Sequence, residues 1–480
     1  MPIDEALLQR AVDRALELGA NYAEARYHLN KVDSVAVRNG RVIGAEVNET
    51  EGIGIRVVVE GALGFAATNK LEWGSVEAAV KAAVERARAV APYMRDPIRF
   101  GDERVGRARY SVAVKKSLED FRLEDAVALA KETFKSTNEA VAGLKVPVSM
   151  FFVEKFIEEK TIINSDGAFV QSSVPRVLVY VNTVIAGERG SMQRFREFGA
   201  SGGAELIDEW DIPTEVSEEA ARLARVLREG KEPPKDPVPV VVGQEVVGLL
   251  VHESCGHPME ADRILGREAA QAGESYVKPD MIGKYRVGTE LVTVIDDPTI
   301  PGSNGFYLFD EEGVPARPRY LYLRGVLNEP LHNRHTAAIF GTRSNAAARA
   351  MDYKSEPIIR MANTYFAPGD MSFAELIEDI RFGVYIKSYQ EWNIDDIRWN
   401  QRYVGLEAYI IRDGELAEPV RNPVLEITTK GFYSRVVGVD KELMFFPGTC
   451  GKGEPSQGVP VWFGGPNVRL EPIKLGVMPA

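Results

Sequence analysis

The hexapeptide His252-Glu253-Ser254-Cys255-Gly256-His257, followed by Pro258, is the stretch around which the chain is organised. It contains two of the five histidines and one of the two cysteines in the 480-residue sequence. Neutral imidazoles are common zinc ligands, and a glutamate beside the first one takes a proton from the attacking water in hydrolytic zinc sites. The stretch, which has the pattern HExxxH, therefore predicts a metal centre that performs hydrolysis.

The spacing of the two histidines differs from the common HExxH pattern, in which the ligands lie four residues apart on one helix face. His252 and His257 are five residues apart, which places them about 140° apart around an ideal α-helix. A π-type turn would return them to one side. Alternatively, the helix ends at Gly256, because glycine accepts unusual dihedral angles and Pro258 disfavours a helical conformation in its predecessor. The simpler alternative to a metal site is a helix that ends in histidine by chance.

A zinc site needs a third ligand, and Cys255, His332, His335 and Cys450 are the candidates. Flanking glycines predict a tight turn at Cys450, and the neighbouring Lys452 would favour its thiolate form. The alternative for Cys450 is a small buried apolar residue. We expect Cys255 to pack into the support of the helix. We expect His332 and His335 to lie at the surface or to contact the ligands without binding the metal. One of them could orient substrate or stabilise an oxyanion.

The hexapeptide and the late segment Gly448-Thr449-Cys450-Gly451 together resemble the TldD/PmbA family, also called modulator-of-gyrase proteins, and specifically its TldD branch. The resemblance covers nearly the whole chain. Its further segments are Gly52–Val57, Gly64–Ala66, Ile295–Asp297, Asp310–Gly313 and Gly325–Leu327. By this resemblance His252, His257 and Cys450 are the zinc ligands and Glu253 is the catalytic base.

The resemblance also implies an activity and a partner. The TldE/PmbA branch is similar in length but lacks the metal motif, whereas this chain keeps it, so the expected activity is that of a zinc-dependent peptidase. The implied substrates are unfolded or short peptides. The implied assembly is a dimer, and commonly a heterodimer with a metal-free paralogue of the TldE/PmbA type. Zn²⁺ is the only cofactor that we expect.

The composition, with 45% hydrophobic and 27% charged residues, is typical of a soluble globular protein. A net charge of -12 argues against direct nucleic-acid binding. No run approaches the roughly 18 apolar residues of a membrane-spanning helix, so no membrane association is expected. The first residues lack the basic and apolar regions of a signal peptide, and two cysteines suggest a reducing compartment. These features predict a cytoplasmic protein.

Two domains are predicted, joined at Gly230–Pro237, a segment with three prolines. Residues 1–230 are expected to form an N-terminal α+β domain with a mainly antiparallel sheet. Residues 231–480 are expected to form a C-terminal mainly β domain, in which the strand 238–242 leads directly into the helix that carries the motif. The overall fold class is therefore α+β, and the fold must return Cys450 to that helix.

Periodicity and turn residues predict the individual elements. Helices are expected over residues 3–18, 75–90, 122–142, 217–228, 344–351 and 372–380. Strands are expected over residues 146–152, 160–164, 177–186, 238–242, 320–323, 403–411 and 424–428. Turns are expected at Asn39-Gly40, within a hairpin, and at Asn164–Gly167.

Several charged segments allow more than one interpretation. Asp296-Asp297 and Asp310–Glu312 lack the ligand spacing of a calcium-binding EF-hand, and we interpret them as solvated turns. Arg343–Asn345 and Arg360–Asn363 are candidates either for lining a substrate channel, where arginine would bind a peptide carboxylate, or for structural salt bridges.

Two other classes of function fit the same motif. One is a metal-binding scaffold or regulatory subunit with structural zinc and no turnover, which would require Cys255, His332 or His335 as a fourth ligand. The other is a metal-dependent hydrolase that acts on amides or esters other than peptides.

Overall fold

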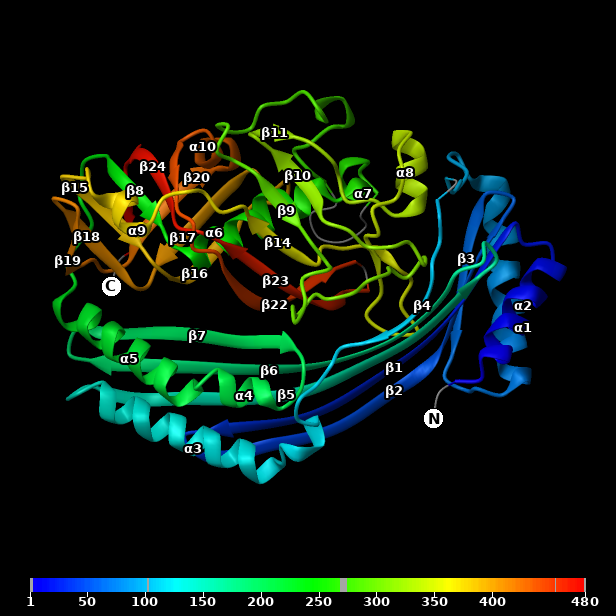
Figure 1. The fold of residues 1–480 in the computed structure, drawn as a ribbon, viewed down its shortest axis with the longest axis horizontal. Helices are drawn as coiled ribbons and strands as arrows, with labels where there is room; N and C mark the ends of the chain where they lie inside the picture. Colours follow the sequence, from blue (N-terminus) through cyan, green and yellow to red (C-terminus); the bar gives the residue numbers. More distant parts are fainter. Residues whose placement is uncertain (1–2, 102, 268–273, 454, 479–480) are drawn as a thin grey trace.

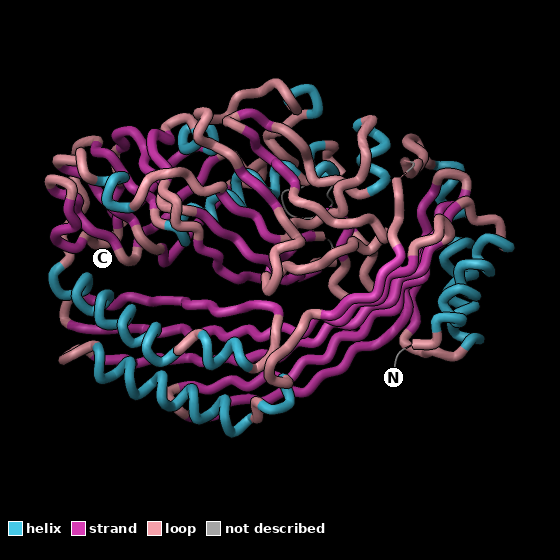
Figure 2. The backbone as a smooth tube through the Cα atoms, in the orientation of Figure 1, coloured by secondary structure: helices cyan, strands magenta, loops and turns pink. Residues whose placement is uncertain are grey.

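The computed structural model describes residues 3–101, 103–267, 274–453 and 455–478. The fold is α+β, as predicted, with one long curved sheet in the first half of the chain and several smaller sheets in the second (Figures 1 and 2). The strands of the long sheet curve around the second half (Figure 1). Across the described residues, we find no helix whose length and apolar character would allow it to cross a membrane.

The first half is built on a seven-stranded sheet. Its strands are β1 (Tyr22–Arg38), β2 (Arg41–Val59), β3 (Ala62–Thr68), β4 (Arg107–Ser111), β5 (Lys145–Asn164), β6 (Phe169–Gly187) and β7 (Gly190–Ser201). The order is β3-β2-β1-β5-β6-β4, with β7 also paired to β6. The sheet is mainly antiparallel, as predicted, and β4 runs parallel to β6.

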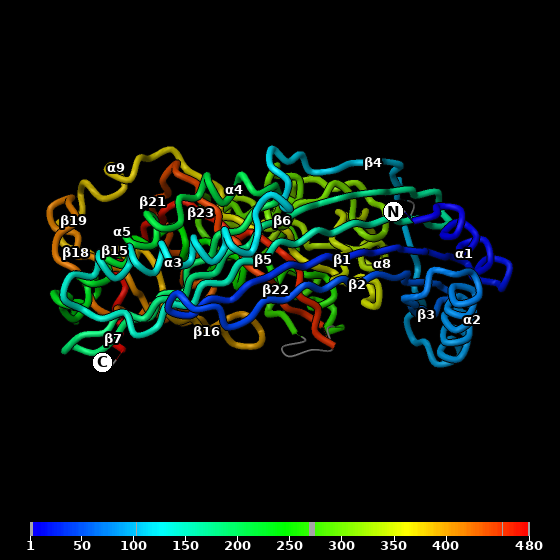
Figure 3. The backbone as a smooth tube through the Cα atoms, turned by 90° about the horizontal axis from the view of Figure 1, so that it is seen from below, coloured from blue at the N-terminus to red at the C-terminus, as the bar shows by residue number. Residues whose placement is uncertain are grey.

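Helices pack on this sheet at its two ends. They are α1 (Glu5–Glu17), α2 (Trp73–Val90), α3 (Leu123–Ala140), α4 (Glu205–Glu209) and α5 (Ile212–Glu229), with the short 3₁₀ turns η1 (Ala91–Tyr93) and η2 (Leu118–Asp120). Seen from below, α1 and α2 lie at one end of the molecule, and α3 and α5 at the other (Figure 3). The apolar positions of α1 recur with the helical period and are buried against β1, β5 and α2, which is why this segment forms a helix.

The predicted hairpin turn is confirmed. Asn39 and Gly40 join β1 to β2 with φ angles of 48° and 75°, the left-handed pair that a two-residue turn requires. One prediction in this sheet was wrong, because residues 146–152 and 160–164 belong to a single strand, β5. Charged residues interrupt the apolar pattern at the centre of this strand, yet Glu158 is buried and pairs with Arg176 at 3.0 Å and with Lys160 at 2.9 Å.

The two acidic segments are not solvated turns, and that prediction was wrong. Asp296 and residues 310–312 are almost fully buried. Glu311 lies 2.7 Å from the ammonium of Lys160 on β5, and Glu312 lies 3.0 Å from the guanidinium of Arg56 on β2. Carboxylates are seldom buried without a charged partner. These ion pairs therefore fasten the long sheet to the second half of the chain.

The second half is mainly β, as predicted. Its strands are β8 (Val238–Val242), β9 (Val294–Asp296), β10 (Arg319–Leu323), β11 (Val326–Leu327), β12 (Ala348–Arg349), β13 (Ile358–Ile359), β14 (Asn363–Phe366), β15 (Phe382–Ile386), β16 (Tyr389–Ile394), β17 (Asn400–Gly405), β18 (Ala408–Arg412), β19 (Glu415–Pro419), β20 (Pro423–Thr428), β21 (Val436–Val439), β22 (Met444–Lys452), β23 (Gln457–Gly465), β24 (Val468–Ile473) and β25 (Gly476–Val477). Its helices and helical turns are α6 (Gln244–Val251), η3 (His252–Gly256), η4 (His257–Met259), α7 (Ala261–Ile264), η5 (Pro279–Met281), α8 (Arg334–Phe340), α9 (Phe373–Ile377) and α10 (Thr429–Tyr433).

The strands of the second half form two six-stranded sheets, a four-stranded sheet and a two-stranded sheet in the described residues. Their orders are β11-β10-β9-β14-β23-β22, β19-β18-β15-β8-β24-β21, β16-β17-β20-β25 and β12-β13. Helix α6 begins two residues after β8 of the second sheet and packs against β14, β22 and β23 of the first. It therefore connects the two large sheets.

Small residues allow α6 to lie directly on β23. A Cβ added at Gly248 of α6 would lie 2.9 Å from Cα of Gly464, and one at Gly465 would lie 2.6 Å from the side chain of Val247. Both distances are shorter than van der Waals contact, so larger side chains would push the helix away. Because β22 is hydrogen-bonded to β23, this close approach also brings Cys450 on β22 to the end of α6.

Two element predictions in the second half were wrong. Residues 344–351 are not helical: Ala346 has a φ of 61°, and the Asn345 side chain binds the backbone N–H of His332 and the carbonyl of Pro330. These tertiary hydrogen bonds outweigh the helix propensity of the alanines. Residues 403–411 form two strands, β17 and β18, rather than one.

The boundary between the predicted domains falls where the sheets separate. In the described part of the chain, no sheet contains strands from both sides of residues 230–237. The division into residues 1–230 and 231–480 remains a proposal, because the buried ion pairs described above join the two parts.

Candidate metal centre

The motif folds as a π turn. Helix α6 ends at Val251, and residues 252–256 continue it as η3, in which the backbone N–H of His257 donates to the carbonyl of His252, five residues back. A π turn has one extra residue per turn, so side chains five apart lie on the same side. Of the two predicted distortions this one is confirmed, and the other, a helix end at Gly256, is wrong because Gly256 keeps a helical φ of -56°.

Side chains in and around the turn form hydrogen bonds with its backbone carbonyl groups. The Ser254 hydroxyl donates to the carbonyl of Leu250 at 2.7 Å, and the Tyr322 hydroxyl donates to the carbonyl of Ser254 at 3.0 Å. Gly256 is needed for space, since a Cβ there would collide with the sulfur of Met361. These contacts stabilise a conformation that is otherwise rare.

Cys450 reaches the π turn from β22. It lies within this strand rather than in the tight turn that the flanking glycines predicted. The guanidinium of Arg360, which is fully buried, donates to the carbonyls of Cys450 and Gln457 and so joins β22 to β23 at this point. The sequence left open whether the arginine segments line a substrate channel or have a structural role. Arg360 has a structural role.

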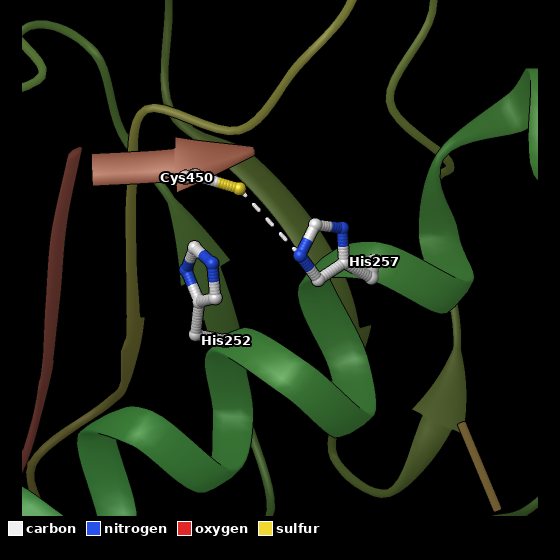
Figure 4. Close-up of side chains that lie close together, drawn as sticks. All are labelled: His252, His257 and Cys450. Carbon is white, nitrogen blue, oxygen red and sulfur yellow. Dashed lines mark hydrogen bonds between the residues drawn. The ribbon is translucent and has the colours of Figure 1, made fainter. Parts of the chain in front are cut away.

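The structure brings together the side chains of His252, His257 and Cys450 (Figure 4). One ligand atom from each lies within 4.8 Å of the others, and all three side chains are buried. The sulfur of Cys450 is 3.5 Å from Nε2 of His257, and the two imidazole rings are 5.1 Å apart between centroids. Nδ1 of His252 is buried and has no hydrogen-bond partner in the described residues.

The protonation of these groups suits a metal ligand set. Burial lowers the pKa of the His252 imidazole, which keeps it neutral. Burial alone would raise the pKa of the Cys450 thiol, but the His257 imidazole and the Arg360 guanidinium outweigh it and lower that pKa. Burial raises the pKa of Cys255 well above its ordinary value. Cys450 is therefore the cysteine that ionises more readily.

Behind His257 lies a buried carboxylate. Glu260 accepts a hydrogen bond from Nδ1 of His257 at 3.1 Å, which leaves the lone pair of Nε2 available on the side of Cys450. Burial alone would raise the pKa of Glu260, but the Lys452 ammonium and the His257 imidazole hold it well below its ordinary value. The sequence suggested that Lys452 would favour the thiolate of Cys450, but its ammonium pairs with carboxylates instead, at 2.8 Å from Asp262 and 3.3 Å from Glu260.

Replacing Glu260 with Gln should weaken zinc binding by about 10- to 100-fold, because the partner that fixes the tautomer and orientation of His257 is lost. Competition with a chromophoric chelator measures the affinity. The control is Glu290→Gln, which changes an exposed glutamate in a surface ion pair. Unchanged affinity in Glu260→Gln would mean that His257 needs no support from this carboxylate.

Glu253 lies between His257 and an arginine that the sequence did not indicate. Its Oε2 is 4.0 Å from Nε2 of His257 and accepts a hydrogen bond from Nη1 of Arg398 at 2.7 Å. Both Glu253 and the ligand side chains are buried. The candidate base therefore lies beside the candidate ligands and is held by a cation.

The other predicted candidates lie elsewhere. Cys255 is fully buried in the hydrophobic core of the second half, as expected. His332 is buried and contacts the Thr336 hydroxyl at 3.1 Å, while His335 lies 2.9 Å from Nη1 of Arg267. In the described residues none of these three belongs to the group of potential ligands.

Sequence reasoning missed Glu260 and Arg398. Glu260 follows His257 by three residues, and a carboxylate one helical turn after a candidate ligand is a signal that could have been used. Arg398 is 145 residues from Glu253 and has no such local signal.

The chain matches three models of one family. They are the PmbA/TldA metallopeptidase domain 1 over residues 23–91, the central domain over residues 116–228 and the C-terminal domain over residues 235–476. The motif and Cys450 both lie in the range of the C-terminal domain.

Curated relatives cover almost the whole chain. A metalloprotease from Methanothermobacter thermautotrophicus is 32% identical over 96% of this chain and 96% of its own length. A zinc metalloprotease TldD homologue from Saccharolobus solfataricus is 27% identical over 97% of this chain and 98% of its own length.

Solved structures share the fold. A protein described as a modulator of a DNA gyrase from Thermotoga maritima has a TM-score of 0.76 and 19% identity, and covers 98% of this chain and 100% of its own. TldE from Thermococcus kodakarensis has a TM-score of 0.72 and 17% identity over 98% of this chain and 100% of its own. Because the three domain models and these relatives match almost the whole chain, the chain belongs to the PmbA/TldD metallopeptidase family.

Proposed function

We propose that this chain is a zinc-dependent peptidase that hydrolyses unfolded or short peptides. His252, His257 and Cys450 would hold the zinc ion, and Glu253 would act as the general base. The observation that carries the proposal is that one potential ligand atom from each of these three residues lies within 4.8 Å of the others. Oε2 of Glu253 lies 4.0 Å from Nε2 of His257.

The residues present fit a zinc ion. Two imidazoles and a thiolate are ligands that zinc prefers. Nδ1 of His252 is a buried polar atom without a partner in the described residues, which is costly unless the ring binds something. A lowered thiol pKa at Cys450 favours the form that binds metal.

Zinc, when bound, supplies Lewis acidity that makes a water molecule more acidic and polarises a peptide carbonyl. The chain supplies the proton transfers. A carboxylate oxygen of Glu253 accepts the proton of the attacking water and then donates it to the leaving amine. Arg398 donates a hydrogen bond to Oε2 of Glu253 and holds this carboxylate beside the proposed ligands.

The ligand count favours catalysis over a structural zinc site. A structural site normally has four protein ligands, whereas catalytic sites keep one position open. In the described residues the group of potential ligands contains three members, and Cys255, His332 and His335 are not among them. A scaffold with structural zinc would therefore lack its fourth ligand among these described residues.

Family membership supports the finer points of the proposal. We propose that the chain works as a dimer, and as a heterodimer where a metal-free paralogue of the TldE/PmbA type is present. A cytoplasmic location remains a prediction; Cys255 and Cys450 are both free thiols, as a reducing compartment would require.

Removing the metal tests the proposal. The purified chain is incubated with unstructured peptides, a folded protein, and small amides and esters, before and after dialysis against a chelator. We expect cleavage of the unstructured peptides alone, its loss after chelation, and its return when zinc is added. Mass spectrometry of the products identifies the bonds that are cut.

Three other outcomes would replace the proposal. Cleavage of small amides or esters but not of peptides would make the chain a different hydrolase. Tight binding of one zinc ion without turnover, both alone and when mixed with a TldE/PmbA-type paralogue, would support a structural role. Peptide cleavage that survives complete zinc removal would rule out a role for the metal.

A further inference from the structure

Arg398 contacts the candidate base from a loop far away in the sequence. The loop, residues 395–399, joins β16 to β17. Nη1 of Arg398 donates to Oε2 of Glu253 at 2.7 Å, and the arginine side chain is only 15% exposed. In this position the guanidinium can fix the direction in which the carboxylate faces.

The backbone of Arg398 adopts a conformation that non-glycine residues rarely take. Its φ is 65°, in the left-handed region. The loop imposes it: the N–H of Arg398 donates to the carbonyl of Asp395 at 3.0 Å, and the carbonyl of Arg398 accepts from the Thr429 hydroxyl at 2.7 Å. The Asp395 carboxylate also accepts from the backbone N–H groups of Trp399 and Asn400. A strained conformation that is held from several sides is typical of functional positions.

The same scaffold supports both the loop and the π turn. The backbone N–H of Tyr276 donates to the carbonyl of Ile397 at 3.0 Å, and the rings of Tyr276 and Trp399 pack edge to face at 5.0 Å. The Tyr276 hydroxyl is 2.5 Å from that of Tyr322, which in turn donates to Ser254 of the π turn. Arg398 and Glu253 are thus positioned by one connected set of contacts.

Fold stability alone does not account for this arginine. Its Nε is buried and has no hydrogen-bond partner in the described part of the chain, which is unfavourable. Its backbone is strained, and taking both charges out of water costs free energy that a single hydrogen bond repays only in part. Residues that carry such costs are commonly retained for function.

We infer that Arg398 is a positioning residue for the general base: its guanidinium fixes the carboxylate of Glu253 in the orientation used for proton transfer. The inference rests on the proposed function. It makes Arg398 part of the catalytic arrangement without making it a metal ligand.

Kinetics of three variants test the inference. In Arg398→Gly the glycine tolerates the positive φ, so the loop keeps its shape while the guanidinium is removed. We expect kcat to fall about 100-fold, the size of effect that follows a displacement of about 1 Å of a catalytic group, with KM changed much less. Methylguanidine in the buffer should restore part of the rate in this variant. Arg398→Lys, which keeps the charge, should lose less than Arg398→Gly.

The matched control is Arg402→Gln. Arg402 lies four residues further along, on β17, and pairs with Glu391 and Glu426 on the surface. We expect wild-type kcat and KM for this variant. A kcat that is unchanged in Arg398→Gly would overturn the inference, and a higher kcat would show instead that Arg398 restrains the base in an inactive state.

A structural readout separates this inference from the proposed function. Crystal structures of the zinc-loaded wild type and Arg398→Gly should show an ordered Glu253 carboxylate in the first and a displaced one in the second. If the wild type cleaves no peptide, either alone or with a TldE/PmbA-type paralogue, the proposed function fails, and the crystal structures still decide whether Arg398 fixes Glu253. An identical carboxylate position in both proteins would refute the inference whatever the activity.

Discussion

The Glu253→Gln variant should bind zinc as tightly as the wild type and hydrolyse unstructured peptides about 10²- to 10⁴-fold more slowly, the range that general acid–base catalysis contributes. Glutamine has nearly the same shape as glutamate but cannot accept and return a proton. Its amide oxygen can still accept the hydrogen bond from Arg398, so the surroundings of the site should change little. The loss should appear in kcat.

Two measurements on the same protein decide this prediction. Zinc content after dialysis establishes that the metal site is intact, and initial rates with a fluorogenic unstructured peptide give the activity. Glu260→Gln serves as the opposite control, because it should lose zinc affinity and recover activity when excess zinc is supplied. Wild-type rates in Glu253→Gln would mean that another group accepts the proton. Loss of zinc in this variant would mean that Glu253 is a ligand rather than a base.

The local part of the site could be predicted from the sequence. The order of His252, Glu253 and His257 implies both the chemistry and the need for a distorted helix, since side chains five residues apart lie about 140° apart around an α-helix. Which distortion occurs could not be decided, because Gly256 and Pro258 are compatible with a helix end. The tyrosines that stabilise the π turn, Tyr322 and Tyr433, come from distant segments.

The non-local part of the site depends on packing that no local pattern encodes. Cys450 was placed by resemblance to a family, and the glycines beside it suggested a turn. In the structure, the glycines that matter most for its position are Gly248 on α6 and Gly465 on β23, which let the helix and the strand touch. Arg398 could not be predicted from a local pattern either, since only the tertiary fold brings it to Glu253.

Charged residues explain the main errors about the fold. The pattern of β5 looks broken at its centre because Glu158 and Lys160 interrupt the apolar run, and the segment Asp310–Glu312 looks like a surface turn. Both belong to one buried set of ion pairs between the long sheet and the second half. Binary patterning assumes that charged residues are exposed, and it fails where charges are paired across an interface.

Cys450→Ala should abolish tight zinc binding. The thiolate is the one anionic ligand in the proposed set, and two imidazoles alone are a poor zinc site. The loss of affinity should exceed the roughly 10- to 100-fold that follows removal of a hydrogen-bond partner to a ligand. Because a ligand stabilises the state that binds it, zinc should raise the Tm of the wild type and leave that of Cys450→Ala unchanged.

The second cysteine provides the matched control. Cys255 lies two residues before His257, is fully buried in the core, and has a pKa well above its ordinary value, so Cys255→Ala should keep one zinc ion per chain. Cobalt substitution identifies the sulfur directly: a thiolate-to-cobalt charge-transfer band should be present in the wild type and in Cys255→Ala, and absent in Cys450→Ala. A band that disappears with Cys255 instead would reverse the assignment. Undiminished zinc binding in both variants would show that neither sulfur is a ligand, and that the 3.5 Å approach of Cys450 to His257 is only a packing contact.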